Sequence, residues 1–76
     1  MYERIKNLRQ DKDLSQKAMA ALLNVAQTTY SDYELGKINI PLATLRNLAF
    51  FHNTSIDYLL DMTDEMIPYT RKKQRR

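Results

Sequence analysis

Hydrophobic side chains recur every three or four residues through most of this 76-residue chain. Such spacing places apolar side chains on one face of a helix and is typical of amphipathic helices in small domains. Tyr2, Ile5 and Leu8 predict a first helix over residues 2–11. The same spacing predicts further helices over residues 15–23, 26–35, 42–52 and 55–60. The sequence therefore predicts an all-α domain of five short helices around one aliphatic core.

The predicted helices are separated by residues that favour caps and turns. Ser15 and Ser55 each precede an apolar stretch, where a hydroxyl can cap the free N–H groups of an opening helix. Asn24 tolerates the left-handed backbone conformation and is expected to replace the glycine of a tight turn. Gly36 and Pro41 bound a loop, because neither residue continues a helix well. We expect one of the two isoleucines in this loop to pack against the core.

The stretch from Ser15 to Gly36 predicts two helices joined by a tight turn. Met19 and Ala20 mark the inward face of the first helix, and Tyr30 and Tyr33 mark that of the second. The opposite face of the second helix carries short polar side chains, namely Gln27, Thr28, Thr29, Ser31 and Asp32. Such side chains can hydrogen-bond to base edges or phosphates without carrying a charge. An ordinary solvated surface is the alternative interpretation of the same residues.

Composition excludes several classes of function. The chain has no cysteine and one histidine, so it offers no disulfide, no thiolate metal site and no thiol nucleophile. It also has no glycine-rich phosphate loop and no paired carboxylates in a plausible cleft, so we expect no enzyme, no cofactor and no metal. No apolar run approaches the length of a membrane span, and the first residues do not open a signal peptide. We therefore expect a soluble cytoplasmic protein without a membrane partner.

The net charge of +3 is distributed unevenly. Residues 1–70 carry seven Lys and Arg against nine Asp and Glu, a balance of −2, and residues 71–76 add five positive charges. This basic tail has three interpretations: a solvated end, an arm on DNA phosphates, or a patch for RNA or a membrane surface.

Residues 4–64 resemble the phage-repressor/Cro-type helix-turn-helix (XRE) family. The resemblance rests on an ordered set of short motifs without a sizeable gap between them. These are Leu14–Gln16, Met19–Ala20, Leu23–Val25, Tyr30–Ser31, Tyr33–Glu34, Gly36–Lys37, Pro41, Thr44–Leu45, Leu48–Ala49 and Ser55–Leu60. It implies a compact lambda-repressor-like, helix-turn-helix DNA-binding domain over residues 1–62. Residues 63–76 would form a flexible C-terminal segment that ends in the basic tail.

The resemblance also implies which side chains contact double-stranded DNA. The residues expected at base edges in the major groove are Gln27, Thr28, Thr29 and Asp32. Those expected at the phosphate backbone are Gln16, Lys17, Ser31, Lys37 and Asn39. Asp32 either imposes a base preference, since a carboxylate accepts a hydrogen bond from cytosine N4, or points away from the DNA.

An ion pair between Arg9 and Glu34 is a further expectation from the family, with two solvated surface charges as the alternative. The chain also departs from the family pattern. Ala26 stands where relatives place a capping Ser or Thr, and His52 and Thr54 stand at positions that are usually apolar. A single histidine without a second ligand at suitable spacing is expected to be packed rather than to bind a metal.

Leu22 and Phe50 fall where relatives carry polar residues, which makes them candidate contacts with a second copy or another protein. The function expected from these features is a sequence-specific transcriptional regulator, a repressor that binds a two-fold operator as a homodimer. Its half-sites would lie about 34 Å apart, one turn of the duplex. The alternative is an antitoxin or adaptor that uses the same fold to hold a protein partner.

Overall fold

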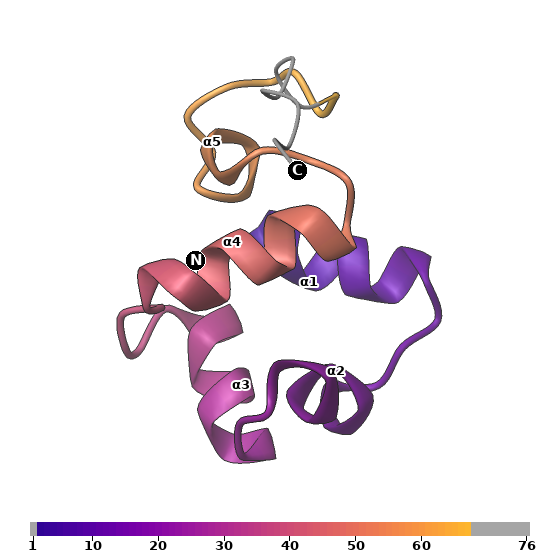
Figure 1. Ribbon diagram of the computed structural model, residues 1–76, viewed down its shortest axis with the longest axis vertical. Helices are drawn as coiled ribbons and strands as arrows, with labels where there is room; N and C mark the ends of the chain where they lie inside the picture. The colour runs from indigo at the N-terminus through magenta and orange to yellow at the C-terminus, as the bar shows by residue number, and fades with distance from the viewer. Residues whose placement is uncertain (1, 68–76) are drawn as a thin grey trace, which may run out of the picture.

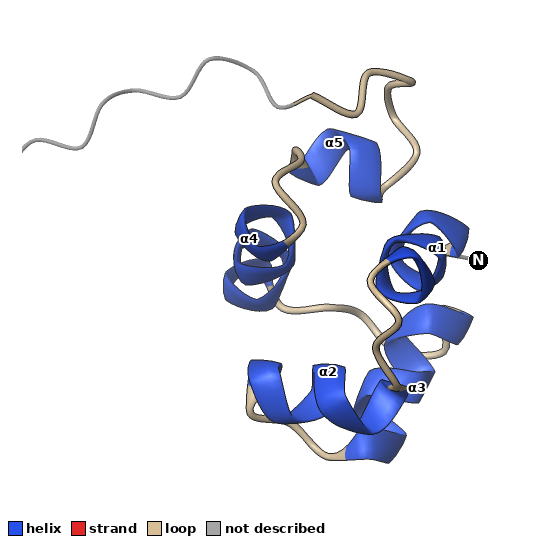
Figure 2. Cartoon of the chain, turned by 90° about the vertical axis from the view of Figure 1, so that its right-hand side faces the viewer, coloured by secondary structure: helices blue, strands red, loops and turns tan. Residues whose placement is uncertain are grey.

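Five helices follow one another in the computed structural model of the chain, which describes residues 2–67. They are α1 (Glu3–Asp11), α2 (Gln16–Leu23), α3 (Gln27–Leu35), α4 (Leu42–Phe51) and α5 (Ile56–Leu59). Figure 2 shows helices and loops, and no strand, in this part of the chain. The predicted all-α fold is therefore confirmed, with helix limits within one or two residues of those expected from the sequence.

Two serine side chains cap the helices that they precede. The Ser15 hydroxyl accepts a hydrogen bond from the backbone N–H of Ala18 at 3.0 Å, and α2 begins there. The Ser55 hydroxyl accepts from the N–H of Tyr58 at 3.0 Å at the start of α5. At the start of α3, Ala26 has the extended backbone of a cap residue but makes no side-chain cap. The helix α3 therefore begins without a side-chain cap, as expected from the alanine at this position.

A residue in the left-handed conformation follows each of the five helices within two positions, and three of these residues are Asn or Gly. Asn24 has φ 59° and ψ 44°, Gly36 has φ 73° and Asn53 has φ 53°. Asn and Gly are the residues for which this conformation is least costly. The backbone N–H groups after these turns return to helix carbonyls, as in the 2.9 Å bond from Val25 to Ala20. The chain can thus reverse direction sharply between α2 and α3.

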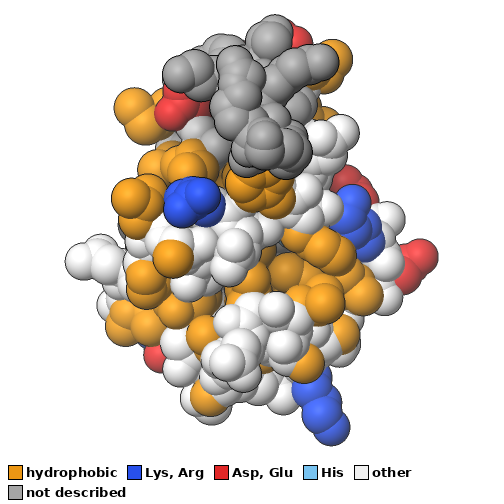
Figure 3. Space-filling model, viewed as in Figure 1, with side chains coloured by type: hydrophobic (Ala, Val, Ile, Leu, Met, Phe, Trp, Pro, Cys, Tyr) orange, Lys and Arg blue, Asp and Glu red, His pale blue; other side chains and the backbone are white. Residues whose placement is uncertain are grey.

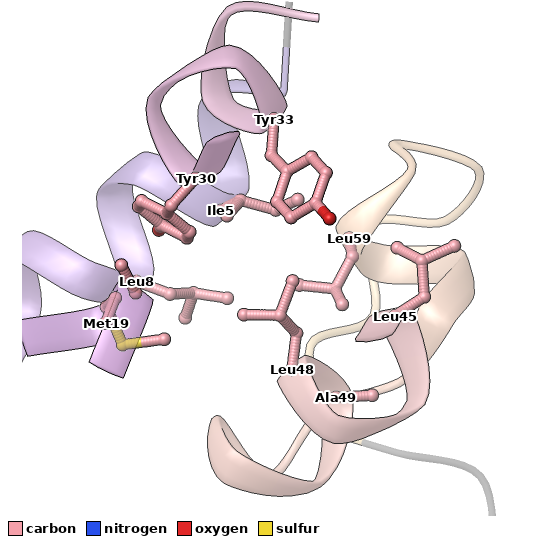
Figure 4. Close-up of a cluster of buried hydrophobic side chains, with 10 residues drawn as sticks. Ile5, Leu8, Met19, Tyr30, Tyr33, Leu45, Leu48, Ala49 and Leu59 are labelled. Atoms are coloured by element: carbon pink, nitrogen blue, oxygen red, sulfur yellow. The ribbon is translucent and has the colours of Figure 1, made fainter. Parts of the chain in front are cut away.

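The core is built from side chains of all five helices (Figure 4). Its buried hydrophobic residues are Ile5, Leu8, Met19, Ala20, Tyr30, Tyr33, Leu45, Leu48, Ala49 and Leu59. The rings of Tyr30 and Tyr33 meet edge to face, with their centroids 6.4 Å apart. Of the two loop isoleucines, Ile40 packs against the core whereas Ile38 is exposed.

Some apolar residues of α4 lie outside the core. Leu42 and Phe51 belong to the apolar pattern that predicted this helix, but they are 68% and 41% exposed. Leu42 occupies the first position of α4, where the chain leaves the loop, and Phe51 occupies the last. His52 and Thr54, which follow the helix, are buried instead.

The helices form three levels along the long axis of the molecule. In both ribbon views α2 and α3 lie at one end, α1 and α4 in the middle, and α5 at the other end (Figures 1 and 2). Residues 61–67 continue past α5 and contact α1 through Arg4. We call these residues the C-terminal strap. The domain boundary expected after residue 62 falls within it, and the basic tail lies outside the described residues.

Candidate nucleic-acid interface

The α2–turn–α3 unit is held by its turn and by the core beneath it. Asn24 ends α2 in the left-handed conformation, and its N–H donates to the carbonyl of Ala21 at 3.1 Å. Val25 follows and packs, half-buried, against the core. The two helices are therefore fixed against each other by backbone hydrogen bonds and by one apolar side chain at the corner. This is the geometry of a helix-turn-helix.

The two faces of α3 differ in burial. Tyr30, Tyr33 and Glu34 are buried on the side that meets the domain. Gln27 and Thr28, in the first turn, are exposed. The other polar residues expected at the DNA, Thr29, Ser31 and Asp32, are half-buried. The first turn of α3 is thus the part of the predicted base-contacting set that is open to a partner.

Arg9 and Glu34, paired by the family resemblance, form an ion pair in the structure. Arg9 Nε lies 2.7 Å from Glu34 Oε2, and Arg9 Nη2 lies 3.3 Å from Oε1. Arg9 Nη1 also donates to the carbonyl oxygen of Leu14 at 2.8 Å. Both charged side chains are largely withdrawn from water, with exposed fractions of 11% and 4%. The pair therefore joins α1 to the last turn of α3 in a buried setting.

The structure also connects Gln16 to this pair. Gln16 Nε2 donates to Glu34 Oε1 at 3.0 Å, and the side chain is half-buried at the first residue of α2. Sequence reasoning placed Gln16 at a phosphate and missed this bond. The two residues are 18 positions apart, so no local spacing pointed to their contact. The bond fixes one N–H of the Gln16 amide and leaves its oxygen and second N–H for other partners.

Electrostatics favour the charged forms of the pair. The hydrogen bond to Glu34 raises the pKa of Arg9 above its ordinary value, although burial opposes this shift. Burial alone would raise the pKa of Glu34, but hydrogen bonds from Arg9 and Gln16 outweigh it and leave this pKa lowered. Burial also raises the pKa of Tyr30, whose hydroxyl is enclosed near the pair. The network therefore stays ionised at neutral pH.

The remaining predicted contact residues are distributed around this unit. Lys17 is exposed in the first turn of α2, and Lys37 and Asn39 are exposed in the loop after α3. Leu22 and Phe50, the candidate protein contacts, are 57% and 54% exposed. On the face in Figure 3, Lys and Arg side chains stand apart from one another, and hydrophobic side chains gather between them. Any phosphate contacts on this face come from separate residues rather than from a continuous basic patch.

The buried histidine does not belong to this surface. His52 is 2% exposed and meets the Phe51 ring at a centroid distance of 5.0 Å. Burial, together with the positive charge of Lys12, lowers its pKa to about 4. Within residues 2–67, no group of three or more potential ligands gathers around a possible metal position. None of the helices in this part has the length and apolar character that crossing a membrane requires.

The fold and the α2–turn–α3 geometry define a helix-turn-helix protein. Comparison with known families agrees, since the family model described as helix-turn-helix matches residues 5–59. The chain therefore belongs to the phage-repressor/Cro-type (XRE) helix-turn-helix family. This is not an enzyme family. No solved structure shows a significant match to the chain.

Three proteins of Bacillus subtilis (strain 168) are similar to this chain, and all are described as HTH-type transcriptional regulators. YobD is 32% identical over 74 residues, which cover 96% of this chain and 66% of YobD. The SPbeta prophage-derived YonR is 39% identical over 61 residues, covering 80% of this chain and 56% of YonR. YqaE is 38% identical over 58 residues, which cover 76% of this chain and 50% of YqaE. The chain thus spans between half and two thirds of the length of these relatives.

Proposed function

We propose that this chain is a transcriptional repressor that binds double-stranded DNA in a sequence-specific manner. The observation that carries the proposal is the orientation of α3. Its inner side is anchored by Tyr30, Tyr33 and the Arg9–Glu34 ion pair, so its exposed first turn is rigidly presented. A recognition helix contacts base edges with its N-terminal residues, which is where Gln27 and Thr28 lie. The description of the three relatives as HTH-type transcriptional regulators supports the same function.

The proposed roles divide between specificity and positioning. Gln27 and Thr28 contact base edges, with Thr29 and Asp32 further along the helix at the margin of the groove. Gln16, Lys17, Ser31, Lys37 and Asn39 contact phosphates, which positions the protein on the duplex without selecting a sequence. The hydrogen bond that Gln16 donates to Glu34 holds the Gln16 amide at the N-terminus of α2, where free backbone N–H groups also favour a phosphate.

A dimer on a two-fold operator completes the proposal. One small module buries little DNA surface, and a two-fold protein matches a palindromic site with half-sites about 34 Å apart. Since DNA is its partner, we place the protein in the cytoplasm. The exposed side chains of Leu22 and Phe50 favour the alternative of an antitoxin or adaptor that holds a protein partner.

Selection of bound duplexes from a random double-stranded pool, repeated at two salt concentrations, tests the proposal. We expect a palindromic sequence whose halves are one helical turn apart to be recovered at both concentrations. Binding that ignores sequence and disappears at the higher salt would contradict it, because counterion release alone then accounts for affinity. A stoichiometric protein partner without any duplex preference would favour the antitoxin or adaptor function.

A further inference from the structure

The first turn of α3 offers two side chains to a partner. Gln27 and Thr28 are its first two residues and are exposed, whereas the other polar residues of this helix that are proposed to contact DNA are half-buried. Of all the residues proposed to contact DNA, only Gln16 uses its side chain in a hydrogen bond within residues 2–67. The Gln27 amide and the hydroxyl and methyl groups of Thr28 are therefore available to base edges.

The sequence of α3 contains no positively charged residue. It reads QTTYSDYEL, with two carboxylates. Glu34 is neutralised by Arg9, and within residues 2–67 the carboxylate of Asp32 has no ion-pair partner. Guanine presents two hydrogen-bond acceptors, N7 and O6, in the major groove, and its usual partner is Arg or Lys. Because α3 carries an unpaired negative charge and no positive one, it is poorly matched to guanine.

The Gln27 side chain complements one base in particular. Its amide ends in an oxygen that accepts hydrogen bonds and an NH₂ group that donates them. Adenine presents an acceptor, N7, beside a donor, the N6 amino group, and so satisfies both ends of the amide. Guanine and thymine leave the amide oxygen without a donor, and cytosine leaves the amide NH₂ group without an acceptor. Gln27 therefore favours adenine over the other three bases.

Thr28 adds a contact of a different kind, through its methyl group. Its hydroxyl can donate or accept a hydrogen bond and therefore distinguishes poorly between bases. Its methyl group can pack against the C5-methyl group of thymine, the apolar group that the major groove presents. Thr28 follows Gln27 directly and projects about 100° further around the helix. The two side chains therefore address neighbouring positions of the groove rather than the same atom.

We propose that the first turn of α3 selects A·T base pairs, with Gln27 bonded to an adenine and Thr28 packed against a thymine. Each operator half-site accordingly carries A·T pairs at the positions beneath this turn. Lys17 and Lys37, the lysines of the proposed interface, lie on α2 and in the loop after α3, outside this turn. The inference rests on the proposed operator binding and specifies which base pairs the operator contains.

Base analogues placed in the selected operator test the adenine contact. 7-Deazaadenine replaces N7 with carbon and keeps the base pair, so at one adenine of each half-site it should weaken binding about tenfold. Gln27→Ala should bind the altered and unaltered duplexes equally. Gln27→Glu should shift the preference at that position toward cytosine, because a carboxylate only accepts hydrogen bonds. Asn47→Ala removes an exposed amide from α4 and is the matched control, which should keep the adenine preference.

Uracil tests the thymine contact, since it lacks only the C5-methyl group. Uracil in place of one thymine per half-site should weaken binding about fourfold, the effect of one buried methyl group. Thr28→Ser should lose the same factor on the thymine duplex and nothing further on the uracil duplex, because one methyl group of the pair is already missing. Thr28→Val keeps a methyl group and should retain the preference for thymine. The helical content of each variant serves as the control for the fold.

The outcomes separate this inference from the proposed function. An operator with G·C pairs at the positions sensitive to Gln27→Ala would overturn the inference and leave sequence-specific binding intact. The inference also fails if 7-deazaadenine weakens binding of the unaltered protein and of Gln27→Ala equally, since Gln27 then does not contact N7. A protein that selects no duplex sequence would reject the operator function and this inference together.

Discussion

Glu34 Oε1 accepts a hydrogen bond from Gln16 Nε2 at 3.0 Å, which links the last turn of α3 to the first residue of α2. The same carboxylate holds Arg9 of α1, so three helices meet at one buried charge. The proposed phosphate contact of Gln16 and the proposed base contacts of α3 are therefore oriented by the same group. Changes at Glu34 should affect both stability and the alignment of the two helices.

Glu34→Ala should destabilise the domain by about 3 kcal/mol, because it leaves the Arg9 guanidinium buried without its partner. Urea unfolding followed by circular dichroism measures this difference. Glu65→Ala, which removes a carboxylate from an exposed position, should change stability by less than about 0.5 kcal/mol. Equal effects of the two substitutions would mean that the buried pair contributes nothing specific.

Ala26→Ser should stabilise the protein by about 1 kcal/mol, because Ala26 already has the extended backbone of a cap and lacks only the hydroxyl. Ser15→Ala should destabilise it by a similar amount through loss of the cap on Ala18. Ala26→Ser adds a side-chain cap and Ser15→Ala removes one, so the two changes in stability should have opposite signs. A neutral result for Ala26→Ser would show that the start of α3 is held by tertiary packing alone.

Stability should fall as the pH is lowered from about 6.5 to about 4, with His52 as the cause. Burial lowers the pKa of His52 to about 4, whereas an unfolded chain has a histidine pKa of about 6.5. The unfolded state therefore binds more protons in this window, and the slope is at most about 1.4 kcal/mol per pH unit. His52→Phe should flatten the dependence between pH 6.5 and 5, where Glu34 does not yet titrate. If the His52→Phe variant kept the same dependence of stability on pH, that dependence would come from another titratable group.

Gln27→Ala should relax the sequence preference of the protein at one operator position and reduce affinity for that operator by about tenfold. Lys37→Ala should instead weaken binding to all duplexes about equally and reduce the salt dependence. Titration of each variant against the selected operator and a scrambled duplex separates these effects. A uniform loss for Gln27→Ala would move Gln27 to the phosphate-contacting group.

Much of the fold could be predicted because its determinants are local. Ser15, Ser55, Asn24 and Gly36 act on the residues next to them, and the apolar spacing fixes which face of each helix turns inward. Leu42 and Phe51 show the limit of this approach. They continue the apolar pattern of α4, but they occupy its two ends and remain 68% and 41% exposed.

The candidate site was predictable in part. The exposed polar turn at Gln27 and Thr28 follows from helical periodicity, and the Arg9–Glu34 pairing came from family resemblance. The bond between Gln16 and Glu34 and the attachment of the strap by Arg4 depend on tertiary contacts across 18 and more positions. Such contacts leave no periodic signal in a single sequence.

The contacts of Arg4 also constrain how the domain can assemble during synthesis. Its partners lie 54 to 60 residues further along the chain, and the buried Leu59 belongs to the same late segment. Contacts between such distant residues form only after both have been synthesised, and they slow folding relative to local ones. The contacts of α1 with residues 58–64 can therefore form only after these late residues have been synthesised. We expect a chain truncated before residue 55 to remain incompletely folded, and one that contains residues 1–67 to close once these residues have left the ribosome.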